Sequence, residues 1–248
     1  MNEFGIAKIV LPKSSVLLAD RLREMILRGP LMQGELLPSE RSLVEETGLS
    51  RGSVREALRM LESEGLVEVL RGRTGGTRIA APKREMLARS VELFVRANSV
   101  SLTALLDCRA AIEPMLARLA ARNRTEDELR ELESLHASFE AAIDDLGRYR
   151  VINYRWHRLV AHCSRNEPLI ALTEAILITA QEAKAYERVT IMPNRIRAIE
   201  MHSKVMDAIR RQDAEAAADA MEEHLTVYSK LVESVGDDSG TNRAPEKP

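Results

Sequence analysis

Three histidines stand where the surrounding pattern would place apolar side chains. His157, His202 and His224 interrupt the apolar stripes of three separate segments with helical spacing, so each would point into a helical bundle. A single histidine at such a position is more often a core residue than a ligand. Three on different helices change that expectation, because neutral imidazole is the commonest metal ligand and facing bundle helices can build metal sites. The other two, His136 and His162, lack this pattern and are expected to be surface or structural residues.

Two further polar residues are expected on these interior faces. Asn153 precedes His157 by one helical turn, so both side chains can point at one centre. Arg109 lies in the middle of an apolar stripe on another segment. A buried guanidinium needs an anion, since an unpaired buried charge is very costly. Two partners remain open at this point: a neighbouring glutamate, or the carboxylate of an incoming ligand.

A second kind of chemistry is expected between Leu37 and Leu66. The spacing predicts two short amphipathic helices joined by a tight turn at Gly48, with Ser39 and Ser50 as N-caps. The second helix would carry its polar face outward, and that face comprises Arg51, Ser53, Arg55 and Arg59. A helix with arginines and hydroxyl groups on one side suits the major groove of DNA.

The neighbouring segments complete a small DNA-binding fold. A helix is predicted from Ser14 or Ser15 to about Arg28, and residues 66–70 and 77–80 alternate as strands do. Three helices followed by a two-stranded, basic-tipped hairpin make a winged helix-turn-helix. The alternative is an ordinary small α+β domain whose arginines are merely solvated. It does not explain why three arginines gather at this hairpin, Arg71, Arg73 and Arg78.

The rest of the chain is predicted to be an all-α antiparallel bundle of six or seven helices joined by short loops. The expected helices cover residues 87–97, 101–123, 125–146, 148–164, 166–189, 192–211 and 213–235. Ser101, a capping box from Thr125 to Glu128, and Asp213 provide N-terminal signals. We therefore expect a mainly α protein with a flexible arm at 1–12, a winged helix-turn-helix at 13–81, a helical domain at 82–235 and a disordered tail at 236–248.

Composition limits the other classes. The 248 residues are 45% hydrophobic, 30% charged and 3% aromatic, a globular balance that favours helix. Residues 1–82 carry 12 Lys/Arg and 11 Asp/Glu, so the placement of arginines, not net charge, indicates nucleic-acid binding. Cys108 and Cys163 lie far apart and are expected to be reduced core thiols. No apolar run approaches the roughly 18 residues of a membrane span and no targeting pattern occurs, which favours a cytoplasmic protein without a membrane partner.

The N-terminal motifs resemble those of the GntR family of bacterial transcription regulators. They are Leu37 to Arg41, Ser50-Arg51, Val54 to Leu58 and Glu64 to Leu66. The resemblance implies DNA contacts from the following residues: Arg41, Ser50, Arg51, Ser53, Arg55 and, at the wing tip in the minor groove, Arg71 and Gly72. Gly52 departs from the bulkier residue common in the family, which leaves one base contact empty.

The C-terminal part resembles the ligand domain of the FadR-type (FCD) subfamily. The matching segments are Arg109 to Pro114, Leu119 to Ala121, His157, Asn166, Glu200 to His202, Ala208-Ile209 and Met221 to Leu225. The resemblance implies a divalent metal of the Zn, Ni or Mn type, with Arg109 near the effector cavity. The implied ligands are Asn153, His157, His202 and His224. Asn153 replaces the family's aspartate, and a neutral amide is a weaker ligand, so occupancy of the site stays open.

Taken together, the resemblance implies a homodimeric regulator, most often a repressor, that binds a two-fold symmetric DNA operator and responds to a small carboxylate. A metal-free regulator that senses an apolar acid is the nearer alternative. A metalloenzyme that uses the three histidines to activate water is the more distant one. It has no evident general base, and it leaves the N-terminal domain unexplained, so we expect no enzymatic activity.

Overall fold

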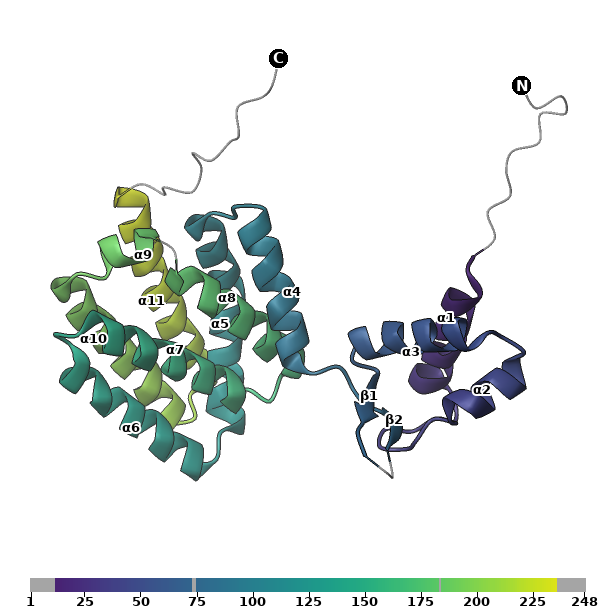
Figure 1. Cartoon of the computed structure of the whole chain (residues 1–248). Coiled ribbons are helices and arrows are strands. Elements are labelled where there is room, and N and C mark those ends of the chain that lie inside the picture. Colours follow the sequence, from purple (N-terminus) through teal and green to yellow (C-terminus); the bar gives the residue numbers. More distant parts are fainter. Residues whose placement is uncertain (1–11, 73–74, 183, 236–248) are drawn as a thin grey trace, which may run out of the picture. The chain divides into compact units, whose positions relative to one another are not determined.

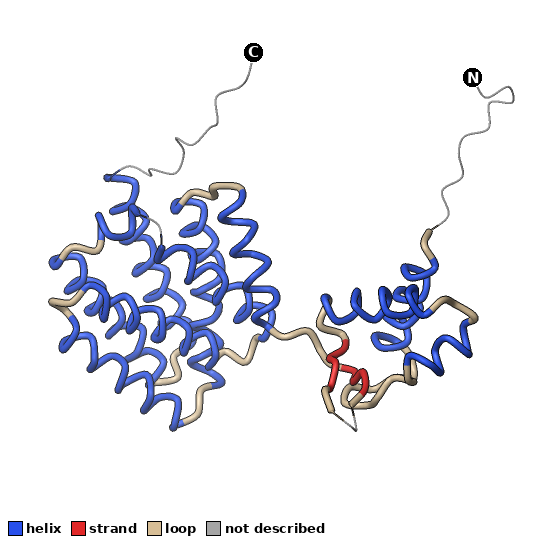
Figure 2. Tube along the Cα trace, in the orientation of Figure 1, coloured by secondary structure: helices blue, strands red, loops and turns tan. Residues whose placement is uncertain are grey.

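The computed structural model describes residues 12–72, 75–182 and 184–235, and it divides the chain into two compact units (Figure 1). The first unit ends at Met86 and the second begins at Leu87. Strands occur only in the first unit among the described residues, and the second consists of helices and their connections (Figure 2). The predicted fold class, a winged helix-turn-helix followed by a helical domain, is confirmed. The predicted arm, apart from Pro12, and the predicted tail lie outside the described residues.

The first unit contains three helices and a wing. Its elements are α1 (Ser14–Arg28), α2 (Glu40–Thr47), α3 (Arg51–Ser63), β1 (Val67–Leu70) and β2 (Gly76–Ile79). Both predicted N-caps are present, because Ser39 Oγ accepts the N–H of Ser42 and Ser50 Oγ accepts that of Ser53, each at 3.1 Å. The helices and the sheet share one apolar core, which includes Leu22, Leu43, Val54, Ala57, Leu61 and Ile79.

The turn between α2 and α3 depends on Gly48, whose φ of 68° is left-handed. Gly48→Ala is expected to destabilise the first unit by about 1 kcal/mol, because an L-residue is strained in this conformation. No heavy atom lies within 4 Å of a Cβ placed there, so the effect is confined to the backbone. Denaturant unfolding measures it.

Gly52→Ala provides the matched control. Gly52 is helical, and the nearest atom to a Cβ there is Ser50 Oγ at 3.7 Å. This substitution should leave stability unchanged or raise it by about 0.5 kcal/mol. Equal stability of Gly48→Ala and the wild type would contradict the role given to the turn.

The wing is an antiparallel pair in which Val67 faces Ile79 and Leu70 faces Gly76. Arg78 Nε donates to Glu68 Oε1 across the two strands at 2.7 Å. This arginine therefore has a structural explanation that the sequence did not suggest. Arg71 is exposed, whereas Arg73 lies outside the described residues.

The second unit is built from the remaining helices. They are α4 (Arg84–Ala97), α5 (Leu102–Asn123), α6 (Glu126–Ala142), α7 (Leu146–Cys163), α8 (Glu167–Glu182), α9 (Lys184–Val189), α10 (Met192–Arg210) and α11 (Ala214–Val235). The described residues thus form eight helical segments here. The helix predicted from residue 166 to 189 corresponds to α8 and α9, and residue 183 between them lies outside the described residues. Tyr186 and Val189 on α9 are buried in the interior.

Helix α5 packs against α7, α8, α10 and α11 and so lies at the centre of this unit. The predicted caps are present at Ser101, in the Thr125–Glu128 capping box, and at Asp213. Trp156 and Phe139 are fully buried in the largest apolar cluster. Cys163 is buried, but Cys108 on α5 is exposed, so the expectation of two core thiols is wrong for Cys108. No helix in the described part of the chain is long and apolar enough to cross a membrane.

Candidate metal centre and DNA-reading surface

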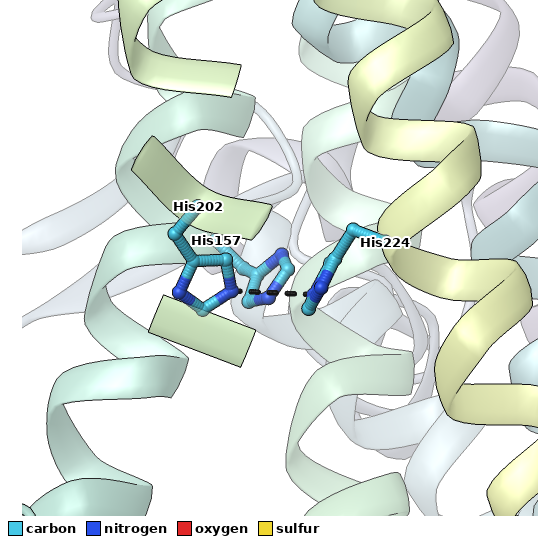
Figure 3. A group of neighbouring side chains, drawn as sticks. All are labelled: His157, His202 and His224. Carbon is cyan, nitrogen blue, oxygen red and sulfur yellow. Dashed lines mark hydrogen bonds between the residues drawn. The ribbon is translucent and has the colours of Figure 1, made fainter. Parts of the chain in front are cut away.

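Three imidazoles from three helices converge inside the second unit. His157 comes from α7, His202 from α10 and His224 from α11, and one nitrogen of each lies within 4.8 Å of the others (Figure 3). The Nε2 atoms of His202 and His224 are 3.2 Å apart, as the dashed line in Figure 3 marks. The sequence prediction that three interrupted stripes meet at one place agrees with this arrangement.

The protonation of the cluster favours metal binding. Burial lowers the pKa of His202 well below its usual value, and the neighbouring imidazoles lower it further. Burial has the same effect on His224, with His157 and Arg109 as additional causes. Both rings are therefore neutral at neutral pH. A neutral imidazole offers the lone pair that a metal ion needs.

Arg109 is paired inside the protein. Its Nε donates to Glu113 Oε1 one turn along α5, and the two residues are 5% and 2% exposed. Burial alone would raise the pKa of Glu113, but the charge of Arg109 and the contact with His157 hold it well below its ordinary value. Of the two partners left open by the sequence, the structure therefore shows the neighbouring glutamate.

Glu113 also determines which nitrogen of His157 is available. His157 Nδ1 lies 2.6 Å from Glu113 Oε2. Burial lowers the pKa of His157, so the ring is neutral, and an ionised carboxylate can only accept a hydrogen bond. Nδ1 therefore carries the proton and Nε2 keeps its lone pair. A carboxylate behind a histidine in this way orients metal ligands in many proteins.

A narrow cavity of about 30 Å³ adjoins the cluster. Its wall includes His157, His224, Arg109 and Asn153. The amide of Asn153 is 7% exposed and donates to the hydroxyl of Tyr186 at 3.4 Å. Three tyrosines, Tyr149, Tyr186 and Tyr228, add hydroxyl groups to this lining. Three of the four predicted ligands, Asn153, His157 and His224, therefore line one space together with the predicted effector residue Arg109, whereas His202 does not line it.

The donor set suits a divalent metal, but the charge balance is incomplete. The buried Nδ1 of His202 has no hydrogen-bond partner among the described residues. The charges of Arg109 and Glu113 cancel, and Asn153 contributes none. Three neutral imidazoles and an amide would leave a divalent cation with its full charge. An anion that enters with the metal would supply the missing negative charge.

Trp156 gives the cluster a built-in reporter. It is the chain's only tryptophan, and its ring stacks on His202 with centroids 4.2 Å apart and an interplanar angle of 24°. The other two histidines lie outside the cluster, as expected. His136 contacts Ser203 Oγ at 2.9 Å, and His162 contacts Glu174 at 2.8 Å.

The predicted DNA-reading residues lie on the outer face of the first unit. Arg51, Arg55 and Arg59 are exposed along α3, and Arg41 lies on α2. Arg41 Nε donates to Glu45 Oε1 at 2.9 Å along its own helix. Ser53 is half-buried, with its hydroxyl 3.0 Å from Ser50 Oγ and 3.1 Å from Ser14 Oγ. Gly72, beside Arg71, has a left-handed φ of 113° that suits the turn of the wing.

Several residues at these sites were not identified from the sequence. They are Glu40, Tyr149, Trp156, Tyr186 and Tyr228. Tyr149 and Trp156 share the stripe of His157, so their spacing was a signal. Glu40 contacts α3 across fifteen residues of sequence, so it had no periodic signal.

Comparisons with known proteins agree with both units. Residues 15–79 match the family described as bacterial regulatory proteins, gntR family, and residues 104–227 match the FCD domain. The HTH-type transcriptional repressor NanR of Enterobacter sp. (strain 638) is 28% identical over 232 residues, 92% of this chain and 88% of that protein. NanR of Citrobacter rodentium (strain ICC168) is 28% identical with the same coverage. The solved structure of Streptococcus agalactiae GntR covers 87% of this chain and 99% of its own, with 26% identity and a TM-score of 0.62.

These relatives are regulators and not enzymes, which agrees with the expectation that the histidines do not serve catalysis. The FCD match spans half of the chain, and the gntR match covers the winged helix-turn-helix. The chain therefore belongs to the GntR family of transcriptional regulators and carries an FCD domain.

Proposed function

We propose that this regulator is a repressor whose affinity for its operator is controlled by a small carboxylate bound in the helical unit at a divalent metal. The metal would be held by His157, His202 and His224, with Asn153 as a fourth, neutral ligand. The convergence of three buried, uncharged imidazoles carries this proposal. The relatives named NanR are themselves described as repressors, which supports the direction of control.

The charge of the site supports a carboxylate as the effector. A bound cation would add positive charge to a buried centre whose own charges cancel, and an anion offsets that charge. Arg109 Nη2 lies 3.3 Å from His157 Nε2, so a guanidinium charge lies next to the metal ligands, where an incoming carboxylate would meet it. Metal and carboxylate would then bind more tightly together than either binds alone, and this coupling is reciprocal.

DNA would be bound by two copies of the winged helix on a two-fold symmetric operator. The contact residues that we propose are Arg41, Ser50, Arg51, Ser53, Arg55, Arg71 and Gly72.

A homodimer is supported by α4, which buries Val95 but exposes Leu87, Leu93 and Phe94. Side chains of this kind are costly to leave in water. The effector would bind one arrangement of the dimer better than another and so shift the population away from DNA.

Arg51→Ala and Arg55→Ala are each expected to weaken operator binding by about 1–3 kcal/mol, the range for a bidentate contact with guanine. Gel-shift titration at one fixed salt concentration measures this loss. Arg28→Ala removes a charge from the end of α1 and should have a smaller effect. Unchanged affinity of both α3 variants would exclude these residues from the interface.

The control mechanism is tested with protein stripped by a chelator and reloaded with Zn²⁺, Ni²⁺ or Mn²⁺. A panel of small carboxylates is added, and Trp156 fluorescence and operator binding are recorded together. We expect one metal to change the fluorescence and one carboxylate to release DNA only in its presence. Release by the carboxylate without metal would favour the metal-free regulator, in which Arg109 and the histidines bind the acid directly. Release by no carboxylate would contradict both.

A further inference from the structure

An ion pair joins α2 and α3, the two helices that carry the proposed DNA-contacting arginines. Arg55 on α3 donates from Nε to Oε2 of Glu40, the first residue of α2, at 2.9 Å. The hydrogen bond and charge of Glu40 raise the pKa of Arg55, so the guanidinium stays charged. The side chains are 63% and 49% exposed, so solvent weakens the pair and its contribution to stability is small.

The contact uses only one edge of the guanidinium. A guanidinium carries five N–H donors in a planar fork. Nε is taken by Glu40, whereas Nη1 and Nη2 of Arg55 have no partner among the residues that the structure describes. These two nitrogens form the edge that can bind O6 and N7 of guanine together. Glu40 therefore fixes the rotation of the plane and leaves the reading edge free.

The surroundings place this edge at an open groove. Glu40, Arg55 and Arg59 line a groove of about 510 Å³ between α3 and the wing, with Gly75 and Gly76 on the opposite wall. A Cβ at Gly75 would lie 2.4 Å from the carbonyl oxygen of Leu70, so only glycine fits there. Gly75 and Gly76 therefore add no side chain to the groove, which is also lined from the wing by Val69 and Thr77.

The other arginines of this face differ from Arg55. Arg41 pairs with Glu45 within one helix, and its side chain is 83% exposed. Arg51 and Arg59 have no acidic partner among the described residues. An exposed arginine without an acidic partner can turn toward a phosphate or a base, so the protein does not fix which of them it contacts. Of these four, Arg55 is the one held by an acid from a different helix.

We propose that Glu40 is a positioning residue for sequence recognition, which orients Arg55 so that its outer edge reads a guanine. The inference rests on the proposed contact between Arg55 and DNA. The carboxylate also cancels the charge of Arg55 and repels phosphates, so the pair adds discrimination between sequences more than general attraction to DNA. Loss of the acid would free Arg55 to bind phosphates on any sequence.

The test compares base preferences of variants of the full chain. The wild type selects its sites from a randomised duplex library, and single base-pair changes in the selected site are then measured by competition at fixed salt. Arg55→Ala identifies the base pair that depends on Arg55. Glu40→Gln is expected to lower discrimination at that same pair about tenfold, with unchanged or tighter binding to unselected DNA. Glu40→Asp should also lower the discrimination at that base pair, because the shorter side chain withdraws from Nε of Arg55. It should leave binding to unselected DNA unchanged, because an acid stays at the start of α2.

Glu62→Gln is the control, since Glu62 lines the same groove but pairs with no arginine among the described residues, and it should keep the wild-type preference. In Arg55→Ala the further change Glu40→Gln should have no additional effect on base preference. Retained preference in both Glu40 variants would overturn the inference while leaving the proposed function intact. Failure of the wild type to select any sequence would instead contradict the proposed function. Unfolding midpoints show whether each variant is folded. If Glu40→Gln does not fold, the base preference of Glu40→Asp decides whether Glu40 positions Arg55.

Discussion

Glu113→Ala is expected to destabilise the helical unit by about 3–5 kcal/mol, the range for breaking a buried ion pair from one side. The substitution leaves the Arg109 guanidinium without its anion, and it also removes the acceptor of His157 Nδ1. Burial works against the charge of Arg109, and the negative charge of Glu113 offsets this effect and raises the pKa of Arg109. Denaturant unfolding followed by circular dichroism measures the change.

Two controls separate the buried charge from the loss of a side chain. Glu215→Ala removes a glutamate from an exposed pair with Arg118 on the same unit, and it should change stability little. Arg109→Met with Glu113→Leu removes both charges, and it should recover much of the stability because apolar pairs often replace buried ion pairs without loss. If Glu113→Ala were as stable as the wild type, the assigned pairing of Glu113 with Arg109 would be contradicted.

The pH dependence of stability has a definite sign here. The pKa of Glu113 is lower in the folded protein than in the unfolded chain. Its contribution is therefore complete above the ordinary carboxyl pKa of about 4.3 and is lost as the pH falls below it. In Glu113→Ala this part of the acid-induced loss should be absent.

Local signals in the sequence predicted most of the fold. Ser39, Ser50, Ser101 and the Thr125–Glu128 box all cap helices as expected, since each depends on a few adjacent residues. The exposure of Cys108 was missed. Which face of a long helix is covered depends on its neighbours, and the residue's own position does not reveal that.

The candidate site shows the same limit. The three histidines could be found because each interrupts an apolar stripe, and Glu113 could be suspected because it follows Arg109 by four residues. The contact of Glu113 with His157, and that of Glu40 with Arg55, join different helices. Such pairs depend on how far one helix is shifted along another. Periodicity within a helix carries no information about that shift.

His202→Ala is expected to abolish the stabilisation that a divalent metal gives to the folded protein. With metal at about 100 times its dissociation constant, the wild type should gain about 2.7 kcal/mol in the free energy of unfolding. The variant loses one of three converging nitrogens and should gain nothing measurable. Thermal unfolding with and without metal, together with elemental analysis, measures the difference. His136→Ala, which removes a histidine outside the cluster, should retain the gain.

Acid should reduce this stabilisation, because metal ligands must be deprotonated. Burial lowers the pKa of His202 and His224 in the folded protein, so their neutral forms contribute stability above the unfolded value of about 6.5 and lose it as the pH falls below. Metal stabilisation that persists unchanged into acid would contradict imidazole ligation.

Asn153→Asp tests the charge balance from the opposite direction. A carboxylate at this position would give the metal the negative charge that the site lacks, so metal affinity without any added acid should rise by about tenfold or more, about 1.4 kcal/mol. Metal binding to this variant should depend less on the carboxylate effector, because the introduced side-chain carboxylate and the effector would supply the same negative charge. In the wild type the coupling between metal and carboxylate should be strong, and in Asn153→Asp it should be weak. Equal coupling in the two proteins would show that Asn153 does not take part.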